Sequence, residues 1–324
     1  MMITEIQPGV NKIDVPIPNN PLKSLNCYVF QSRGRNLVID TGFNRSECRE
    51  ILLSGLAELQ VDLENTDVLI THMHADHSGL VADLVSRGAT AYCSREDGEL
   101  INTDDSHWEA MRVFTKTGGF PVEVFQDAIH KHPGFKYRAM EKVEFTIVED
   151  GDMLTVGDYS FSCVKTPGHT RGHMCLYEKK KKILISGDHV LQDITPNISL
   201  WSDRYDPLHD FLCSLDRVSL LDVKLVLPGH RALIMDLHKR IEELKVHHRH
   251  RSDEVLEILR GKELNAYQVA AKMTWDMTYN TFEEFPVAQK WFATGEALAH
   301  LKYLEGLGAL QRKTDQDAVL YQLV

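Results

Sequence analysis

The stretch THMHADHS, residues 71–78, is the part of this sequence from which its fold and chemistry are most directly inferred. It places three histidines and one aspartate within residues 72–77. Neutral imidazole nitrogen and carboxylate oxygen are the usual protein ligands of zinc and similar divalent ions. Side chains alternate along an extended segment, so His72 and His74 are expected on one side of it. Asp76 and His77 follow where the chain turns, and they can reach a second ion beside the first.

Three later segments repeat one pattern, in which a strand-like run is followed by a turn and then by a residue of metal-binding type. Residues 159–170 end in TPGHT with His169, residues 183–188 end in SGD with Asp188, and residues 223–230 end in LPGH with His230. The apolar run 67–70 stands in the same relation to the histidines that follow it. All of these side chains are therefore expected at one edge of a sheet core, where they can converge.

These motifs resemble, in kind and in order, those of the metallo-β-lactamase superfamily over roughly residues 1–235. The resemblance implies an α+β fold, namely the four-layer αβ/βα sandwich of that superfamily. It also implies a dinuclear site, in which one ion is held by His72, His74 and His169, the other by Asp76, His77 and His230, and Asp188 bridges the two. Asp76 and Asp188 are then the expected catalytic carboxylates. We expect two divalent metal ions, with Zn²⁺ preferred and iron or manganese also compatible with the ligand types.

Other polar residues near these motifs have supporting roles in the prediction. Asp40, in VIDTG at 38–42, resembles the DTG turn of the superfamily and is expected to hold a ligand imidazole through a hydrogen bond. His173 is expected to act indirectly at most. Asn197 either donates a hydrogen bond to the substrate or begins a turn. The basic run 247–251, which contains three histidines, is interpreted as a solvated helix end or linker.

Composition restricts the class of protein and of partner. The chain has 324 residues, 43% of them hydrophobic, and a formal net charge of −11. Such a charge disfavours polyanionic partners, so a small-molecule substrate is expected rather than a nucleic acid. We find no apolar run long enough for a membrane span. The six cysteines lack CxxC spacing and the first residues do not resemble a secretory signal, so a cytoplasmic protein is expected.

The chain is long enough for one large domain with an appendage. We expect a catalytic domain over 1–248 and a smaller domain over 249–324. Within the first, the aromatic insert 104–137 interrupts the strand pattern, and either a lid, additional packed helices or an oligomer contact would explain it.

The C-terminal segment is predicted to form helices at 252–259, 265–273 and 287–304 and a hairpin of 310–313 with 319–323. This order resembles a winged-helix unit. Residues 251–324 carry eight Lys or Arg and eleven Asp or Glu, a net charge of −3. Phosphate contacts supply most of the affinity of DNA-binding modules, so a packing role or a homodimer contact is preferred.

The predicted function is metal-dependent hydrolysis, in which a metal-bridging hydroxide attacks a small-molecule acyl bond, a thioester or a lactone. True zinc β-lactamases usually have cysteine at the turn where this chain has Asp188, so β-lactam hydrolysis is disfavoured. An aspartate there resembles the glyoxalase II, lactonase and ribonuclease branches. The alternatives are a metal-dependent ribonuclease or phosphodiesterase, an iron persulfide dioxygenase, and a non-enzymatic winged-helix regulator.

Overall fold

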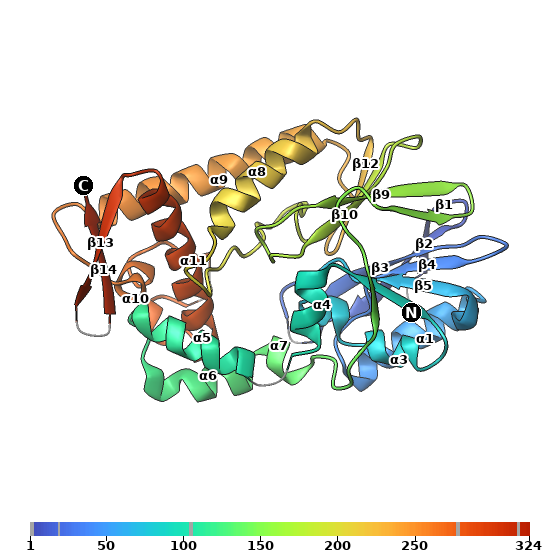
Figure 1. Cartoon of the computed structure of the whole chain (residues 1–324), viewed down its shortest axis with the longest axis horizontal. Coiled ribbons are helices and arrows are strands. Elements are labelled where there is room, and N and C mark those ends of the chain that lie inside the picture. Colours follow the sequence, from blue (N-terminus) through green and yellow to red (C-terminus); the bar gives the residue numbers. More distant parts are fainter. Residues whose placement is uncertain (1–2, 19, 104–105, 277–278, 316–317) are drawn as a thin grey trace. The chain divides into compact units, whose positions relative to one another are not determined.

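A computed structural model describes residues 3–18, 20–103, 106–276, 279–315 and 318–324 (Figure 1). The chain forms two compact units. The first contains Met1–Thr103, Pro133–Pro196 and Ser214–Ile241, and the second contains Asp104–His132, Asn197–Cys213 and Glu242–Val324. Two helices, α8 (Pro207–Ser219) and α9 (Leu237–Ile258), are continuous across this division of the sequence.

The first unit contains a seven-stranded sheet in which the strands follow one another in chain order. The strands are β1 (Ile3–Gln7), β2 (Val10–Pro16), β3 (Ser24–Phe30), β4 (Asn36–Ile39), β5 (Thr66–Leu69), β6 (Thr90–Cys93) and β7 (Phe145–Ile147). Strands β1 to β4 are antiparallel, whereas β4 to β7 are parallel and are joined through helical segments. These segments include α1 (Ser46–Glu58), η1 (Leu63–Asn65), α2 (Ala75–Ser78), α3 (Val81–Val85), α4 (Arg95–Ile101) and α7 (Pro133–Lys136).

The second sheet of this unit has five strands in the order β12-β11-β10-β9-β8. They are β8 (Met153–Val156), β9 (Tyr159–Lys165), β10 (Met174–Glu178), β11 (Ile183–Gly187) and β12 (Leu225–Pro228). All neighbours are antiparallel except β11 and β12, which run in parallel. The carboxyl ends of β11 and β12 therefore meet at one edge of the sheet.

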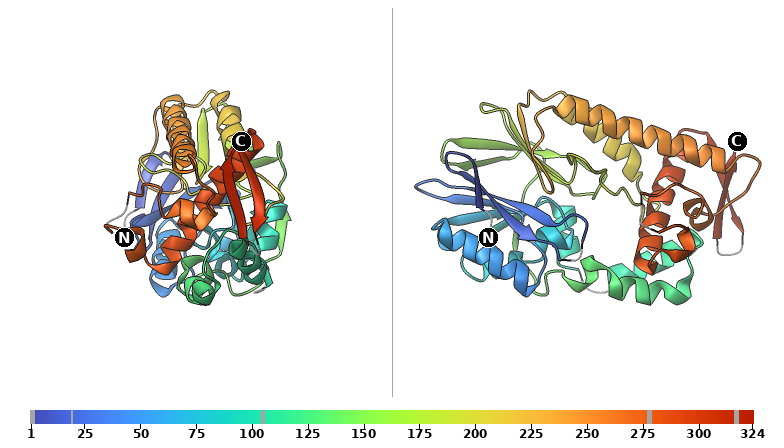
Figure 2. Two further views of the ribbon diagram at one scale, coloured as in Figure 1. Left: turned by 90° about the vertical axis from the view of Figure 1, so that its left-hand side faces the viewer. Right: turned by 180° about the vertical axis from the view of Figure 1, so that it is seen from behind.

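Apolar side chains from both sheets form one core between them. The rings of Phe30 on β3 and Phe161 on β9 meet edge to face, with centroids 5.0 Å apart. A second apolar cluster lies on the other face of the seven-stranded sheet, where Leu52 and Leu56 of α1 pack against strand residues such as Ile13. Figure 2 shows the two sheets face to face with α1 outside them. These layers agree with the predicted α+β sandwich.

The second unit is built around the helix α11 (Val287–Gly306). Its Trp291 is 1% exposed, donates a hydrogen bond from Nε1 to Thr115 Oγ1 at 3.2 Å and contacts the ring of Phe125. The remaining elements are α5 (Ser106–Thr117), η2 (Val122–Val124), α6 (Phe125–Lys131), α10 (Ala266–Ala270), η3 (Phe282–Glu284), β13 (Leu310–Asp315) and β14 (Ala318–Leu323). The predicted terminal hairpin is present, although residues 316 and 317 of its turn lie outside the described residues.

The observed division of the chain differs from the expected one. The boundary predicted between residues 248 and 249 falls inside α9, and the predicted helix 252–259 is the end of that helix. Residues 104–132 group with the C-terminal segments because α5 and α6 pack with α11; residues 104 and 105 lie outside the described residues.

The interpretation of residues 247–251 as a solvated helix end or linker was wrong in part, because the run lies inside α9 and only one of its faces, with Arg249 and His250, is exposed. His248 and Arg251 lie inside α9 and are 2% and 8% exposed. His248 packs beside the rings of Phe211 and His300 in the second unit. Among the helices in the described ranges, none combines the length and apolar character needed to cross a bilayer.

Candidate metal centre

Strand β5 leads directly into the histidine-rich stretch. It lies between the parallel strands β4 and β6, and the chain leaves the sheet at its carboxyl end. His72 and His74 occupy the bend that follows, where an extended segment was predicted, and α2 then begins at Ala75. Asp76 and His77 therefore stand in the short helix α2, where a turn of the chain was predicted.

The other three predicted ligands reach the same edge from the second sheet. His169 lies in the loop between β9 and β10, Asp188 directly follows β11, and His230 follows β12 after Gly229. All seven predicted ligands belong to the first unit.

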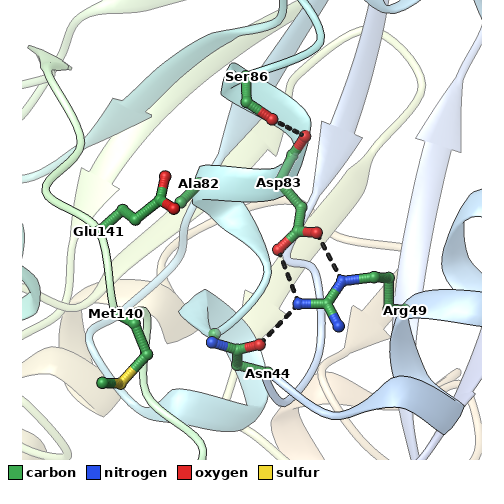
Figure 3. A pocket seen from close by; sticks show the side chains of 8 residues that line it. Asn44, Arg49, Ala82, Asp83, Ser86, Met140 and Glu141 are labelled. Carbon is green, nitrogen blue, oxygen red and sulfur yellow. Dashed lines mark hydrogen bonds and ion pairs between the residues drawn. The ribbon is translucent and has the colours of Figure 1, made fainter.

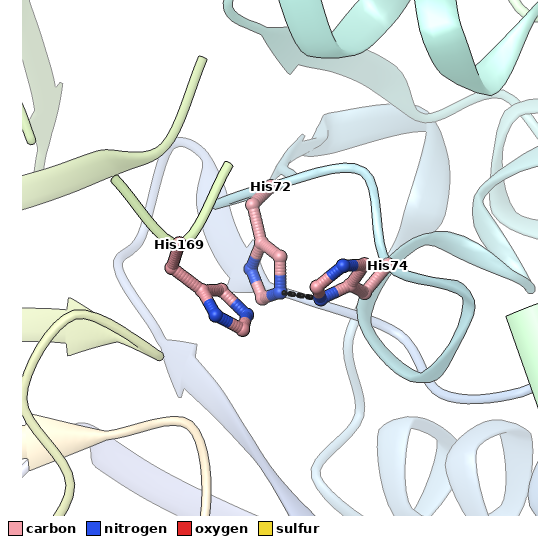
Figure 4. Close-up of side chains that lie close together, drawn as sticks. All are labelled: His72, His74 and His169. Atoms are coloured by element: carbon pink, nitrogen blue, oxygen red, sulfur yellow. Dashed lines mark hydrogen bonds between the residues drawn. The ribbon is translucent and has the colours of Figure 1, made fainter. Parts of the chain in front are cut away.

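The seven side chains form three overlapping groups, and within each group the candidate ligand atoms lie within 4.8 Å of one another. One group is His72, His74 and His169 (Figure 4), in which His72 Nε2 lies 3.1 Å from His74 Nδ1. Another is Asp76, His77 and His230. In that group His230 Nε2 lies 3.2 Å from His77 Nε2 and 3.4 Å from an oxygen of Asp76.

Asp188 lies between these two groups and also forms the third group with His72 and His77. Its Oδ1 lies 3.5 Å from His77 Nε2. Its Oδ2 lies 3.6 Å from His230 Nε2 and 3.7 Å from His169 Nε2. A single carboxylate is therefore placed to reach both sets of donors.

The geometry fits divalent metal ions. Zn–N bonds of about 2.0–2.1 Å at tetrahedral angles separate neighbouring ligand atoms by about 3.4 Å. The closest approaches between the candidate ligand atoms run from 3.1 to 3.7 Å. Asp188 Oδ1 is buried and accepts no hydrogen bond of ordinary geometry from the described residues, which is costly unless a cation neutralises it. The donor types and their spacing are those of a metal site.

The protonation of the cluster is set by burial and by its own charges. Burial lowers the pKa of His72, and it lowers the pKa of His74 to about 3. Burial alone would raise the pKa of Asp76, but His230 and His77 lower it to about 2. Neutral imidazoles and ionised carboxylates are the forms that bind metal ions.

His77 and His230 behave differently from the other two imidazoles. Burial alone would lower the pKa of His77, but the carboxylates of Asp188 and Asp40 raise it well above the ordinary value. Burial acts on His230 in the same way, and Asp188 and Asp76 raise its pKa. A metal ion at these two side chains therefore competes with protons.

Asp40 supports the cluster from the end of β4. Its Oδ2 lies 2.7 Å from His77 Nδ1, and its two oxygens accept hydrogen bonds from the Thr71 backbone nitrogen and hydroxyl. This contact places the Nδ1 proton of His77 toward the carboxylate, so that Nε2 faces the other donors. The backbone of Asp40 has a φ of 59°, a conformation that aspartate and asparagine tolerate better than most residues.

His173 does not belong to a group of predicted metal ligands, but it contacts the segments that contain two of them. Its Nδ1 lies 2.8 Å from the Thr166 hydroxyl, and its Nε2 accepts a hydrogen bond from the Asp188 backbone nitrogen at 3.1 Å. Gly187 permits this approach, because a Cβ there would lie 2.7 Å from His173 Nε2. Among the described residues, neither His173 nor His189 belongs to a potential metal-binding group.

Strand β3 holds the loop of His230 through contacts that the sequence did not reveal. His230 Nδ1 lies 2.8 Å from the Ser24 carbonyl oxygen. Asn26 donates to the carbonyl oxygens of Pro228 and Arg231, both at 2.9 Å, and Tyr28 donates to the Pro228 oxygen at 2.8 Å. The available signal was a polar Asn26 within an apolar strand, and it does not identify the partner.

Asn197 lies in the second unit. It accepts a hydrogen bond from Ser199 at 2.6 Å and donates to Glu296 at 3.4 Å. Its suggested contact with substrate stays a prediction.

A surface pocket of about 170 Å³ in the first unit contains none of the seven predicted ligands (Figure 3). Arg49 in its wall donates to Asp83 at 2.6 Å and to Asn44 at 2.8 Å. The charges of Arg49 and Asp83 are therefore engaged with each other.

The chain belongs to the metallo-beta-lactamase superfamily. The family model of that description matches residues 21–230, and a model of the metallo-beta-lactamase-like C-terminal domain matches residues 253–322. The superfamily and the α+β sandwich predicted from the sequence are thereby confirmed, and the chain is a metal-dependent hydrolase. The resemblance of the C-terminal segment to a winged helix stays a prediction.

Similar proteins agree with this assignment. A metallo-beta-lactamase family protein of Thermus thermophilus has a crystal structure with a TM-score of 0.82 and 30% identity, covering 99% of this chain and 100% of that one. The probable metallo-hydrolase YqjP of Bacillus subtilis is 26% identical over 96% of this chain and 97% of its own length. The human acyl-coenzyme A thioesterase MBLAC2 is 28% identical over 63% of this chain and 72% of its own.

Proposed function

We propose that this protein hydrolyses a small-molecule thioester with two divalent metal ions, held by the seven side chains described above. The observation that carries the proposal is the place of Asp188, whose two oxygens lie 3.5–3.7 Å from His77, His230 and His169. One carboxylate shared by two sets of donors is the arrangement that a dinuclear centre requires.

The bound ions would polarise the acyl carbonyl and lower the pKa of a water molecule, so that a nucleophile is available at neutral pH. The side chains of the protein would position the attacking water and accept hydrogen bonds from it. Asp76 is ionised at neutral pH because its pKa is lowered to about 2, and its side chain is 15% exposed. Its carboxylate is therefore able to accept a hydrogen bond from the attacking water and to orient it.

The Nδ1 atom of His77 contacts Asp40, and the Nδ1 atom of His230 contacts the Ser24 carbonyl oxygen. These contacts leave Nε2 of each imidazole as the atom that faces the centre. Metal ligands that are held rigidly in this way would keep a bound ion in place. The ion could then stabilise charge as it develops in the transition state without reorganisation of the site.

One observation supports a thioester among the possible acyl substrates, and another argues against a nucleic acid. A human relative that is 28% identical over 63% of this chain is an acyl-coenzyme A thioesterase. The net charge of −11 disfavours a large polyanion such as RNA as the substrate.

The test is a metal analysis followed by a panel of acyl-coenzyme A thioesters, lactones and an activated phosphodiester. We expect two divalent ions per chain and thioester turnover that is lost on chelation and restored by added metal. As a matched pair, Asp188→Ala should lower turnover by about 10²–10³-fold or more, while Asp158→Ala, at an exposed turn of the same unit, should leave it unchanged. Activity confined to the phosphodiester, or thioester turnover that survives full removal of metal, would overturn the proposal.

A further inference from the structure

We propose that Asp97 is a positioning residue that fixes the two ligand-bearing loops, 71–78 and 166–173, relative to each other. The inference rests on the proposed function, because it concerns the ions that these loops would hold. Asp97 lies in α4, outside every motif from which the ligands were predicted.

The carboxylate of Asp97 accepts three hydrogen bonds from these loops. Oδ2 accepts from the Met73 backbone nitrogen at 2.9 Å and from the Thr170 hydroxyl at 2.5 Å. Oδ1 accepts from the Gly172 backbone nitrogen at 2.9 Å. An ionised carboxylate has only acceptor positions, so it satisfies three converging donors that no neutral side chain of similar size could satisfy together.

The donors are placed directly beside predicted ligands. Met73 stands between His72 and His74, and Thr170 follows His169. These three imidazoles form one of the donor groups, although 95 positions or more separate His169 from the other two in the sequence. Asp97 is therefore the shared anchor of the two backbone segments that assemble this group.

Asp97 is itself held in place. It is fully buried, and the Ser94 hydroxyl at the start of α4 accepts a hydrogen bond from its backbone nitrogen at 3.3 Å. The backbone of Gly172 packs closely against Ser94 and Asp97. A Cβ at that position would lie 2.2 Å from Ser94 Oγ and 2.6 Å from Asp97 Oδ1. A residue without a side chain is needed for the second loop to approach the carboxylate.

A buried carboxylate is a costly side chain at this position. Burial raises the pKa of Asp97 to about 6 even though the three hydrogen bonds act in the opposite direction. The charge that acts on this carboxyl is that of Glu96, which also raises its pKa. Burying an ionised group without a cation is unfavourable, so the gain from this side chain lies in the geometry it imposes.

The test measures metal affinity rather than activity alone. Metal-free wild type, Asp97→Asn, Thr170→Val and Thr170→Ser are titrated with Co²⁺ against a chelator, and the absorption of the cobalt forms is recorded. Glu99→Gln is the matched control, because it makes the same change from carboxylate to amide at an exposed position of the same helix. Circular dichroism of the metal-free proteins reports whether each variant is folded.

We expect Asp97→Asn and Thr170→Val to weaken the binding of one of the two ions by about 10–100-fold, the usual effect of losing an outer-shell partner. The other ion should bind as in wild type. Thr170→Ser keeps the hydroxyl and should restore most of the affinity, and Glu99→Gln should match wild type.

Equal affinities and spectra in wild type, Asp97→Asn and Thr170→Val would overturn the role of Asp97. A wild-type protein that binds Co²⁺ but hydrolyses no thioester would contradict the proposed function alone, because the comparison of affinities would still stand. A wild-type protein that takes up no Co²⁺ would overturn both.

Discussion

The Nδ1 atom of His77 lies 2.7 Å from Oδ2 of Asp40, and both side chains are almost fully buried. The contact joins the segments that follow two neighbouring strands, because Asp40 follows β4 and His77 lies beyond β5. It determines which nitrogen of His77 is left to face the other donors. A carboxylate behind a metal-binding imidazole raises the basicity of the ligand and fixes its orientation.

We therefore predict that Asp40→Asn lowers the affinity of the centre for metal by about 10–100-fold while the protein stays folded. Asparagine is the appropriate replacement because it accepts the φ of 59° at this position, which alanine would resist. The measurement is a chelator competition with Zn²⁺. Wild-type affinity in Asp40→Asn would show that the carboxylate is not needed to orient His77.

A second prediction concerns Asp188. Replacing it with alanine removes the carboxylate that lies 3.5–3.7 Å from donors of both groups, and removing such electrostatic support typically costs a few kcal/mol in barrier. We expect kcat to fall by about 10²–10³-fold or more in a protein with an unchanged circular dichroism spectrum. The variant must be assayed with excess metal. Turnover near wild type under these conditions would contradict the shared position assigned to Asp188.

A third prediction follows from the glycine before His230. A Cβ at Gly229 would lie 2.6 Å from Asp188 Oδ1 and 2.8 Å from His77 Cε1. Gly229→Ala should therefore displace members of both donor groups and reduce metal content and turnover together. Gly34→Ala is the control, since a Cβ there meets no atom within 4 Å. Metal analysis of the two purified variants separates the outcomes, and full metal content in Gly229→Ala would show that the loop can yield.

The ligands could be predicted from the sequence because they obey local rules. His72 and His74 are two residues apart directly after a buried strand, and each later ligand follows a strand and a turn. Parallel strands such as β11 and β12 end at one edge, so the positions of Asp188 and His230 follow from the pattern. Family resemblance supplied the rest of the fold, since the order of strands in two sheets is not a local property.

The supporting contacts could not be predicted in the same way, because they join residues that are distant in the sequence. Asn26 donates to Pro228 across 202 positions, and Asp97 accepts from Thr170 across 73. A buried polar residue in an apolar strand or on a short helix signals that a partner exists without identifying it. The error at residues 247–251 has a related cause, since charge suggested solvent where packing against Phe211 and His300 buries one face of α9.

His248 and His300 form a buried pair in the second unit, with ring centroids 5.5 Å apart. Neither nitrogen of His248 hydrogen-bonds to any described residue, and His300 Nδ1 lies 3.2 Å from the Ser252 hydroxyl. Burial, followed by the charges of His247 and Arg251, lowers the pKa of His248 to about 3. Burial, with the charges of His248 and Arg251, also lowers the pKa of His300.

The last prediction is that the second unit loses stability in mild acid through this pair. The unfolded chain binds a proton at each histidine near pH 6.5 while the folded unit does not, so unfolding is favoured as the pH falls from 6.5 toward 3. His248 alone should cost about 1.6 kcal/mol between pH 6.5 and 5.0, because the slope is half of its limit of about 1.4 kcal/mol per pH unit at pH 6.5 and approaches that limit at lower pH.

Tryptophan fluorescence during urea unfolding is a selective measure of this effect, because the four tryptophans, Trp108, Trp201, Trp275 and Trp291, all belong to the second unit. His248→Leu should reduce the dependence of the unfolding free energy on pH by about one proton, whereas His250→Gln, at an exposed position of the same helix, should not. The metal-free protein is used so that loss of metal in acid does not contribute. An identical pH dependence in wild type and His248→Leu would mean that water or a rearranged side chain already solvates the pair.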